Sequence, residues 1–239
     1  MSELEGAENI DNLMRQSRLP DRKRADYLAF RRDAIIEQKS LEVDLDAQIQ
    51  PLVADYFRTR KISNTGTITF KSFVQVLADS HETNDIKAQL RKILTRRVDD
   101  LLATADKQTH DTRETFLIPR AVGIVVILND TAQLIEPDFV TDKAFAMLRK
   151  CSSTGEIRYP DNHVVVLISE AHRIPSSEAD LIPIETVFSD AGNRLPLATK
   201  CSDMLKQKWA AFNGASYVES SDLTRDVTPR DQQRLFRTN

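Results

Sequence analysis

The sequence predicts an α/β protein with a mixed central β-sheet flanked by helices. Two segments, 123–128 and 163–168, are apolar along almost their whole length, as strands are when both faces of a sheet are covered. Between them, residues 136–150 have the spacing of a helix with proline in its first turn. Strand, helix and strand in this order form a βαβ unit, which implies a parallel pair with a right-handed crossover.

The remaining elements follow from apolar periodicity and from turn residues. Helices are expected over 5–17, 44–60, 84–105 and 197–212, and strands over 25–30, 34–41, 67–70 and 184–188. Residues 73–77 fit either a strand or a helix, and the polar residues 106–115 are expected to form a loop.

The composition is that of an ordinary globular protein. The chain has 239 residues, of which 41% are hydrophobic and 29% charged, with a net charge of -3. We expect one α/β domain over 1–213, in which 61–115 is a mostly helical insertion. The polar residues 214–239 are expected to form a tail.

Several classes of protein are disfavoured by what the sequence lacks. Its two cysteines form no CxxC pair, which argues against a structural zinc site and for a reducing compartment. The acidic start has no apolar signal region, and no apolar run approaches the ~20 residues that span a bilayer. The glycines form neither GxxxxGK[ST] nor GxGxxG. We therefore expect a cytoplasmic protein without membrane contact.

A hairpin over 25–41 carries the residues that point most directly to chemistry. If Arg31 pairs with Ala34 across the turn, Asp26 lies opposite Lys39 and diagonal to Glu37. All three side chains then share one face, because side chains alternate along a strand. An even-numbered turn keeps this arrangement, whereas an odd-numbered turn would move Asp26 to the other face.

These residue types suit the hydrolysis of a phosphodiester bond. Two neighbouring carboxylates can hold Mg²⁺ or Mn²⁺, which polarises the phosphate and lowers the pKa of an attacking water. A nearby lysine can orient that water or stabilise the developing charge. The backbone carbonyl of Gln38, between Glu37 and Lys39, is a candidate third oxygen ligand.

The segment resembles the PD-(D/E)XK nuclease superfamily, whose sites combine an acidic residue on one strand with (D/E)-X-K on the next. Asp26 matches the lone acid, and Glu37 and Lys39 match the second motif. The resemblance covers about the N-terminal quarter of the chain and a later strand. It implies a restriction-endonuclease-like core, in which helix, strands, helix and strand follow in this order. Here they correspond to 5–17, the hairpin, 44–60 and 123–128.

The sequence also departs from the family pattern. Too few residues separate the first helix from Asp26 for the family's first strand, which 67–70 would have to supply. A literal Pro20-Asp21 makes Asp21 an alternative ligand, although it lies beyond the paired part of the hairpin. Many members take a further glutamate from the first helix, for which Glu8 and Glu5 are the candidates.

The alternative explanation for Asp26 and Lys39 is an ordinary cross-strand ion pair on a solvated face, worth roughly 0–1 kcal/mol. The predicted face also carries Leu28, Phe30 and Ile35, which implies partial burial. Charges beside an apolar surface are costly unless something such as a metal compensates them. This cost favours the metal site.

Basic residues gather beside the hairpin and in the segment after it. Residues 57–97 contain nine Lys or Arg and three Asp or Glu, a net +6 within a chain of net charge -3. This asymmetry fits contact with a phosphate backbone, although charges on a helix are more often simply solvated. The candidate nucleic-acid-binding residues are Arg22, Lys23, Arg24, Lys87, Arg91 and Arg96.

Two further patterns have interpretations of their own. His172 follows an apolar strand, where the general base of a hydrolase can lie, but no GxSxG nucleophile elbow accompanies it. The apolar stripe of 86–105 indicates a core helix or a homodimer interface. The sequence as a whole predicts a Mg²⁺- or Mn²⁺-dependent nuclease that acts on nucleic acid, with DNA as the expected substrate. The alternative is a catalytically inactive nuclease-like scaffold that binds nucleic acid or protein.

Overall fold

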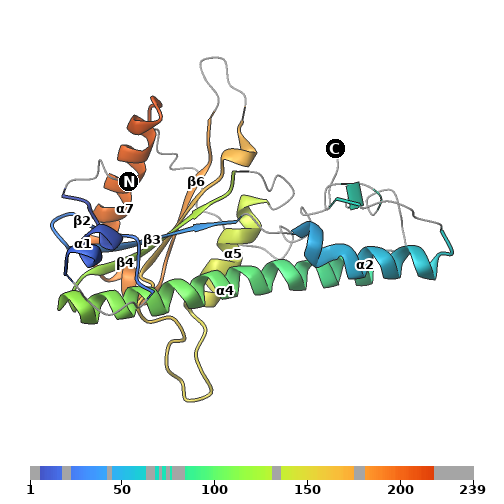
Figure 1. The fold of residues 1–239 in the computed structure, drawn as a ribbon, viewed down its shortest axis with the longest axis horizontal. Coiled ribbons are helices and arrows are strands. Elements are labelled where there is room, and N and C mark those ends of the chain that lie inside the picture. Colours follow the sequence, from blue (N-terminus) through green and yellow to red (C-terminus); the bar gives the residue numbers. More distant parts are fainter. Residues whose placement is uncertain are drawn as a thin grey trace.

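The computed structural model describes residues 6–17, 23–41, 45–62, 68–69, 72–73, 76, 84–130, 136–174 and 181–217. Six strands form one mixed open sheet, and helices pack on both of its faces (Figure 1). The strands are β1 Glu8–Asn9, β2 Tyr27–Ala29, β3 Ala34–Ser40, β4 Val122–Leu128, β5 Val164–Ile168 and β6 Ile184–Phe188. The helices are α1 Ile10–Ser17, α2 Leu45–Thr59, α4 Asn84–Phe116, α5 Pro137–Leu148, α6 Asp190–Asn193 and α7 Pro196–Phe212, with a 3-10 turn, η1, at Glu170–His172. The predicted α/β class is confirmed.

The order of the strands along the sheet follows their order in the chain, from β1 to β6. The central strands β3, β4 and β5 are parallel, and β2 and β6 pair antiparallel at their two sides. Helix α5 connects β4 to β5, as the βαβ pattern predicts, and α2 and α4 lie between β3 and β4 in the chain. Because β4 and β5 are covered on both faces, nearly all of their side chains are buried and apolar.

Two apolar layers hold the helices against the sheet. On one face, Val125 and Ile127 of β4 join the cluster that contains Leu102 of α4 and Val140 of α5. On the other face, residues of β4 and β5 at the alternate positions pack with Ala198, Cys201 and Leu205 of α7. Helices α4 and α5 therefore share one face of the sheet, and α7 covers the opposite face.

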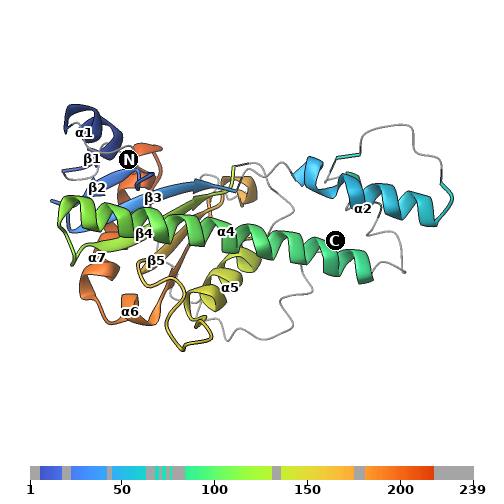
Figure 2. The same cartoon turned by 60° about the horizontal axis from the view of Figure 1, so that its bottom comes forward.

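Helix α4 is about twice as long as the strands of the sheet that it covers. Its 33 residues span about 50 Å, whereas the 7 residues of β3 span about 23 Å. Its C-terminal half crosses the sheet, and its N-terminal half extends past the strands beside α2 (Figure 2). Ile49 and Val53 of α2 belong to the apolar cluster that contains Val98 of α4. We call α2 together with residues 84–105 of α4 the helical arm.

One expectation about 61–115 was wrong. Residues 106–115 are helical, although they were predicted to form a loop. Their polar side chains are satisfied by the rest of the fold: Thr112 Oγ1 accepts the N–H of Ala25 at 3.0 Å, and Arg113 donates to the carbonyl of Ala121 at 2.8 Å. These residues form the end of α4, which packs on the sheet and precedes β4 in the chain.

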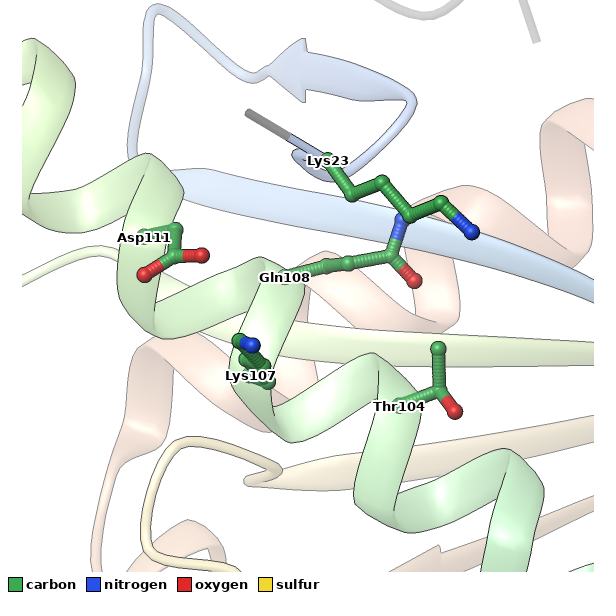
Figure 3. A pocket seen from close by; sticks show the side chains of 5 residues that line it. All are labelled: Lys23, Thr104, Lys107, Gln108 and Asp111. Carbon is green, nitrogen blue, oxygen red and sulfur yellow. The ribbon is translucent and has the colours of Figure 1, made fainter. Parts of the chain in front are cut away.

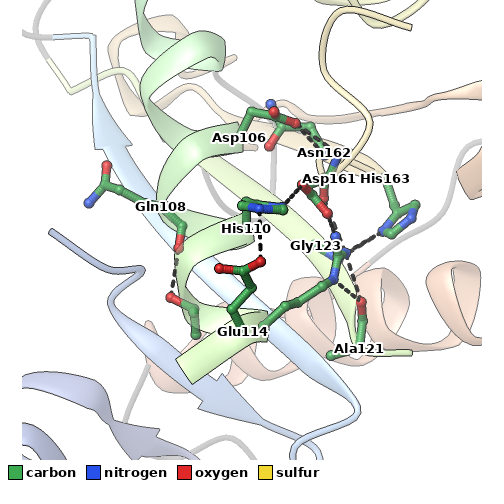
Figure 4. A network of polar contacts seen from close by, with 11 residues as sticks. Asp106, Gln108, His110, Glu114, Ala121, Gly123, Asp161, Asn162 and His163 are labelled. Atoms are coloured by element: carbon green, nitrogen blue, oxygen red, sulfur yellow. Dashed lines mark hydrogen bonds and ion pairs between the residues drawn. The ribbon is translucent and has the colours of Figure 1, made fainter. Parts of the chain in front are cut away.

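A polar network ties α4 to the loop that precedes β5 (Figure 4). The carboxylate of Asp106 accepts the N–H groups of Asp161 at 2.8 Å and Asn162 at 3.2 Å, and burial raises the pKa of Asp106 to about 6. The Asp161 carboxylate pairs with Arg113 on the next turns of α4. These contacts set the position of the C-terminal half of α4 over the sheet.

His163 and Gly123 complete this network. His163 Nδ1 accepts hydrogen bonds from the N–H of Gly123 at 3.0 Å and from Arg113 at 3.1 Å. Burial and the charge of Arg113 lower the pKa of His163 to about 4, so the imidazole is neutral and can accept both bonds. A Cβ at position 123 would lie 2.0 Å from the carbonyl oxygen of Asp161, so the close approach requires glycine.

The N-terminal region differs from its prediction at the start of the helix. Helix α1 begins at Ile10 rather than at residue 5, because Glu8 and Asn9 form β1 against β2. Asn9 Oδ1 accepts the N–H of Asn12 at 3.1 Å and so caps the helix. The predicted strand at 67–70 lies partly outside the described residues, and its described members, 68–69, are not in a strand. From residue 218 onward, the predicted tail also lies outside the described part.

Cys151 is exposed and Cys201 is buried, and both thiols are free. Burial raises the pKa of the Cys201 thiol to about 11, which leaves it protonated. Across the described residues, no helix is both long and apolar enough to cross a membrane.

Candidate active site

The turn between β2 and β3 sets the register of the candidate site. Ala29 pairs with Ala34, so the turn has four residues, 30–33, and the predicted pairing of Arg31 with Ala34 is wrong. Three successive residues of this turn have positive φ angles: Phe30 at 54°, Arg31 at 58° and Arg32 at 71°. L-residues seldom adopt this conformation, and the turn contains no glycine that would have predicted it.

Contacts with distant residues hold this turn. Arg32 donates from Nε and Nη2 to the two carboxylate oxygens of Glu8, each at 2.8 Å. Its guanidinium also lies over the ring of Phe116, 5.8 Å from the centroid. Hydrogen bonding to Arg32 lowers the pKa of Glu8. Glu8 is therefore engaged at the tip of the hairpin, and the structure does not bring it to the proposed metal site.

The observed register shifts the pairing by two residues, and it covers only Tyr27–Ala29 of the first strand. Asp26 lies just before this paired part, and its backbone N–H donates to the carbonyl of Ile36 at 3.1 Å, so its predicted pairing with Lys39 is wrong. Glu37 and Lys39 alternate with Ile36, which packs on the α7 side, and therefore lie on the face covered by α4. Phe30, predicted on this face, lies in the turn and packs with the cluster on the α7 side.

Polar contacts connect Asp26 to the backbone of β3, Lys39 to Glu37, and Lys39 to α4. Asp26 Oδ2 accepts the N–H of Gln38 at 2.7 Å, and the ammonium of Lys39 pairs with the Glu37 carboxylate. Lys39 Nζ also donates to Gln108 Oε1 at 2.7 Å, and Gln108 Nε2 donates to the carbonyl of Arg24 at 2.7 Å. Gln108 thus links the lysine of the motif to the segment that leads into Asp26.

The backbone N–H and C=O of Gln38 point to the side of β3 on which Asp26 lies. In a strand, the N–H and C=O of one residue point to the same neighbouring strand. Because the Gln38 N–H meets Asp26, the Gln38 carbonyl faces the segment before β2 as well. The Gln38 side chain is exposed.

Burial dominates the electrostatics of the site. Glu37 is only 1% exposed, and burial raises its pKa to about 7 although Lys39 acts in the opposite direction. Burial also raises the pKa of Asp26, against the effects of the Gln38 N–H and of Lys39. Glu37 Oε2 is buried and finds no hydrogen-bond partner among the described residues. A buried carboxylate oxygen without a donor is costly, so the site has capacity for a further positive group.

Sequence reasoning missed two residues near this cluster. Gln108 was overlooked because its segment was taken for a loop. Asp11, in the first turn of α1, lies near enough to raise the pKa of Asp26 by charge repulsion. The sequence would have placed Gln108 on a helix only if the apolar periodicity continued through 106–115. It does not, because polar residues occupy the inward face of the helix there.

An open pocket of about 440 Å³ borders the site on the side of α4 (Figure 3). Lys23 lies on one side of it, and Thr104, Lys107, Gln108 and Asp111 line it from α4. The Gln108 amide extends from the helix toward Lys23 in Figure 3. The wall of the pocket therefore includes the side chain that contacts Lys39.

The predicted nucleic-acid-binding residues have different environments. Lys23 is exposed at the pocket, and Arg96 is exposed on α4. Arg24 is half-buried and donates from Nε to Thr115 Oγ1 at 3.1 Å, so it supports the fold locally. Lys87 and Arg91 are on α4, but their side chains are outside the described part of the structure, as are residues 21–22 and Glu5.

Ser169 and His172 lie at the carboxyl end of β5, where His172 is the alternative candidate for the general base of a hydrolase. Ser169 Oγ is 2.8 Å from His172 Nδ1 and accepts a hydrogen bond from Asn129 Nδ2 at 3.1 Å. Ser169 is fully buried. A buried hydroxyl cannot meet a substrate, so this pair shapes the loop after β5 and does not supply a nucleophile.

The chain matches no protein-family model, no curated protein and no solved structure. Function must therefore be inferred from the chemistry of the site.

Proposed function

We propose that this protein is a metal-dependent nuclease that hydrolyses phosphodiester bonds of nucleic acid, with DNA as the expected substrate. One observation carries the proposal. The buried carboxylate of Glu37 lies beside Asp26 and Lys39, with one oxygen lacking a partner among the described residues. Gln108, which contacts Lys39, lines an open pocket next to this cluster. Two carboxylates and a lysine in a buried cluster suit phosphoryl chemistry better than they suit a surface ion pair.

The donor set fits Mg²⁺ or Mn²⁺. Asp26 and Glu37 would hold the ion through hard oxygen ligands, and the Gln38 carbonyl faces the same region. No group of three Asp, Glu, His or Cys side chains in the described ranges could hold a metal alone. Two carboxylates are nevertheless enough for Mg²⁺, which commonly completes its coordination with water and substrate phosphate.

The chain's own residues have distinct roles in this proposal. The bound ion would polarise the scissile phosphate and lower the pKa of the attacking water. Lys39 lies beside Glu37 and would orient that water or stabilise the extra negative charge on the phosphate. Gln108 holds the Lys39 ammonium by its Oε1 and is thus a positioning residue. Burial on the α4 side restricts water around the carboxylates.

The order of elements supports a restriction-endonuclease-like core. Helix α1, the β2–β3 hairpin, a helix and the strand β4 follow one another, which is the family order. The connection from β3 to β4 contains two helices, and the one that packs on the hairpin is α4. The helix at 44–60 was expected in that role. No strand lies between α1 and β2 in the described residues, so the departure noted for the family's first strand remains.

Substitution of the motif tests the proposal. Glu37→Ala and Lys39→Ala should each abolish cleavage of DNA in Mn²⁺, with the fold checked by circular dichroism. Gln38→Ala is the matched control inside the motif, because the exposed side chain is removed and the backbone carbonyl is kept. Cleavage that persists in both the Glu37 and the Lys39 variants would rule out this site.

The alternative function is a non-catalytic binding module on the same scaffold. It is favoured by the pairing of Glu37 with Lys39 and by the Glu37 pKa of about 7, because this carboxylate can stay uncharged or paired without a metal. Calorimetric titration with Mn²⁺ separates the two functions. A nuclease should bind the ion and lose that binding in Glu37→Ala, whereas a scaffold should bind no ion in either form.

A further inference from the structure

We propose that a nucleic-acid duplex lies along the exposed face of α4, from the pocket at Lys23 and Lys107 to Arg96 and Lys92 on the helical arm. This inference rests on the proposed nuclease function and specifies its substrate as a duplex that extends well beyond the scissile bond. We call Lys107, Arg96 and Lys92 the α4 track.

The pocket is where the track meets the candidate site. Lys23 and Lys107 both line it and both are exposed. Gln108, between them in Figure 3, contacts Lys39 at 2.7 Å. Two ammonium groups at the rim of an open pocket suit a backbone phosphate next to the one that is cleaved.

Helix geometry places the other two residues of the track on the same side. Arg96 and Lys107 are eleven residues apart, which is close to three turns, so both project from one face about 16 Å apart. Lys92 is one turn further along, about 6 Å beyond Arg96. All three side chains are exposed.

The same face also carries acidic residues, whose effect on binding should be opposite to that of the basic residues. Asp100 lies between Arg96 and Lys107 and is exposed, and Asp111 lines the pocket. A phosphate backbone on this face would be repelled by Asp100. Removing that charge should therefore strengthen binding, the reverse of the effect expected for the basic residues.

The composition of the face favours a duplex over a single strand. Proteins that bind single strands stack bases on aromatic side chains. The exposed residues described along this face are Gln89, Lys92, Arg96, Asp100, Ala103 and Lys107, none of them aromatic. A straight helix with spaced cations suits a duplex, whose axis is straight over a short length, and 16 Å corresponds to roughly five base pairs at 3.4 Å each along that axis.

The test measures binding without cleavage. Full-length protein in Ca²⁺ would be titrated against a labelled DNA duplex of about 20 base pairs at several salt concentrations. Arg96→Ala, Lys92→Ala and Lys107→Ala should each lower affinity and reduce the slope of log K against log salt by about 0.9. Asp100→Asn should raise affinity. Lys208→Ala, an exposed lysine on α7 across the sheet, is the matched control and should bind as the wild type does.

The results separate the track from the nuclease proposal. Wild-type affinity and salt slope in all three basic variants would overturn the track, as would weaker binding by Asp100→Asn, even if the protein cleaves DNA. The expected shifts in a protein that fails to cleave would keep the track and remove the nuclease function. A single strand of the same length should bind more weakly and respond less to Arg96→Ala, and an equal response would overturn the preference for a duplex.

Discussion

Replacing Glu37 by Gln should stabilise the metal-free protein at alkaline pH. The carboxylate is buried, and its pKa is raised from the ordinary 4.5 to about 7. Its ionised form is therefore disfavoured by the folded state. Below pH 4.5 the group is protonated in both states and contributes no penalty. As pH rises from 4.5 to 7, stability is lost, and above pH 7 the full penalty applies.

The size of the effect follows from the shift in pKa. A difference of about 2.5 units between the folded and unfolded states corresponds to about 3 kcal/mol at 1.36 kcal/mol per unit. Glutamine has nearly the shape of the protonated acid and never ionises, so it avoids this penalty. In a chain of 239 residues, the gain should raise Tm by roughly 6–12 °C at pH 8.5. At pH 5 the gain should fall to about 1 kcal/mol.

Urea and thermal unfolding in EDTA at pH 5 and pH 8.5 would measure this difference. Glu156→Gln makes the same chemical change at an exposed position and should alter stability little at either pH. A gain equal at both pH values would refute the reasoning. So would a loss of stability at pH 8.5, because it would mean that Lys39 stabilises the ionised carboxylate more than burial destabilises it.

Two further predictions concern the metal and the fold. Mn²⁺ at about 100 times its Kd should stabilise the wild type by about 2.7 kcal/mol at pH 8.5, measured as a rise in Tm. The rise should be much smaller at pH 5, because Glu37 is then protonated. Asp26→Asn should abolish the rise, and a rise that survives this substitution would place the ion elsewhere. Gly123→Ala should cost about 3 kcal/mol or more in urea unfolding, because its methyl would lie 2.0 Å from the Asp161 carbonyl oxygen. Gly155→Ala separates backbone strain from overlap, because its methyl would meet no described atom within 4 Å but its φ of 83° strains alanine, so it should cost only about 1–2 kcal/mol.

Much of the fold could be predicted from local patterns. The apolar strands β4 and β5, the helix between them and the strand β6 all lie where periodicity and turn residues indicated. The hairpin and the shared face of Glu37 and Lys39 were also predictable, because side chains alternate along a strand. These features depend on neighbours in sequence and on whether a segment is buried on one or both sides.

The register of the hairpin could not be predicted in the same way. Its turn uses three left-handed residues, and none of them is glycine. Arg32 is held by Glu8 and by Phe116, which is 84 positions later in the chain. A conformation that is stabilised by such distant contacts leaves no signal in the residues of the turn.

The sequence itself determined that Glu37 and Lys39 of the hairpin motif share one face, because side chains alternate along a strand whatever lies around it. Only the tertiary structure decided what surrounds that motif. The polar end of α4 lies over the hairpin, buries Glu37 and places Gln108 against Lys39. The physical reason is that burial and hydrogen-bond partners come from segments far apart in the chain. The raised pKa of Glu37, and with it the chemistry proposed for this site, is therefore a property of the fold.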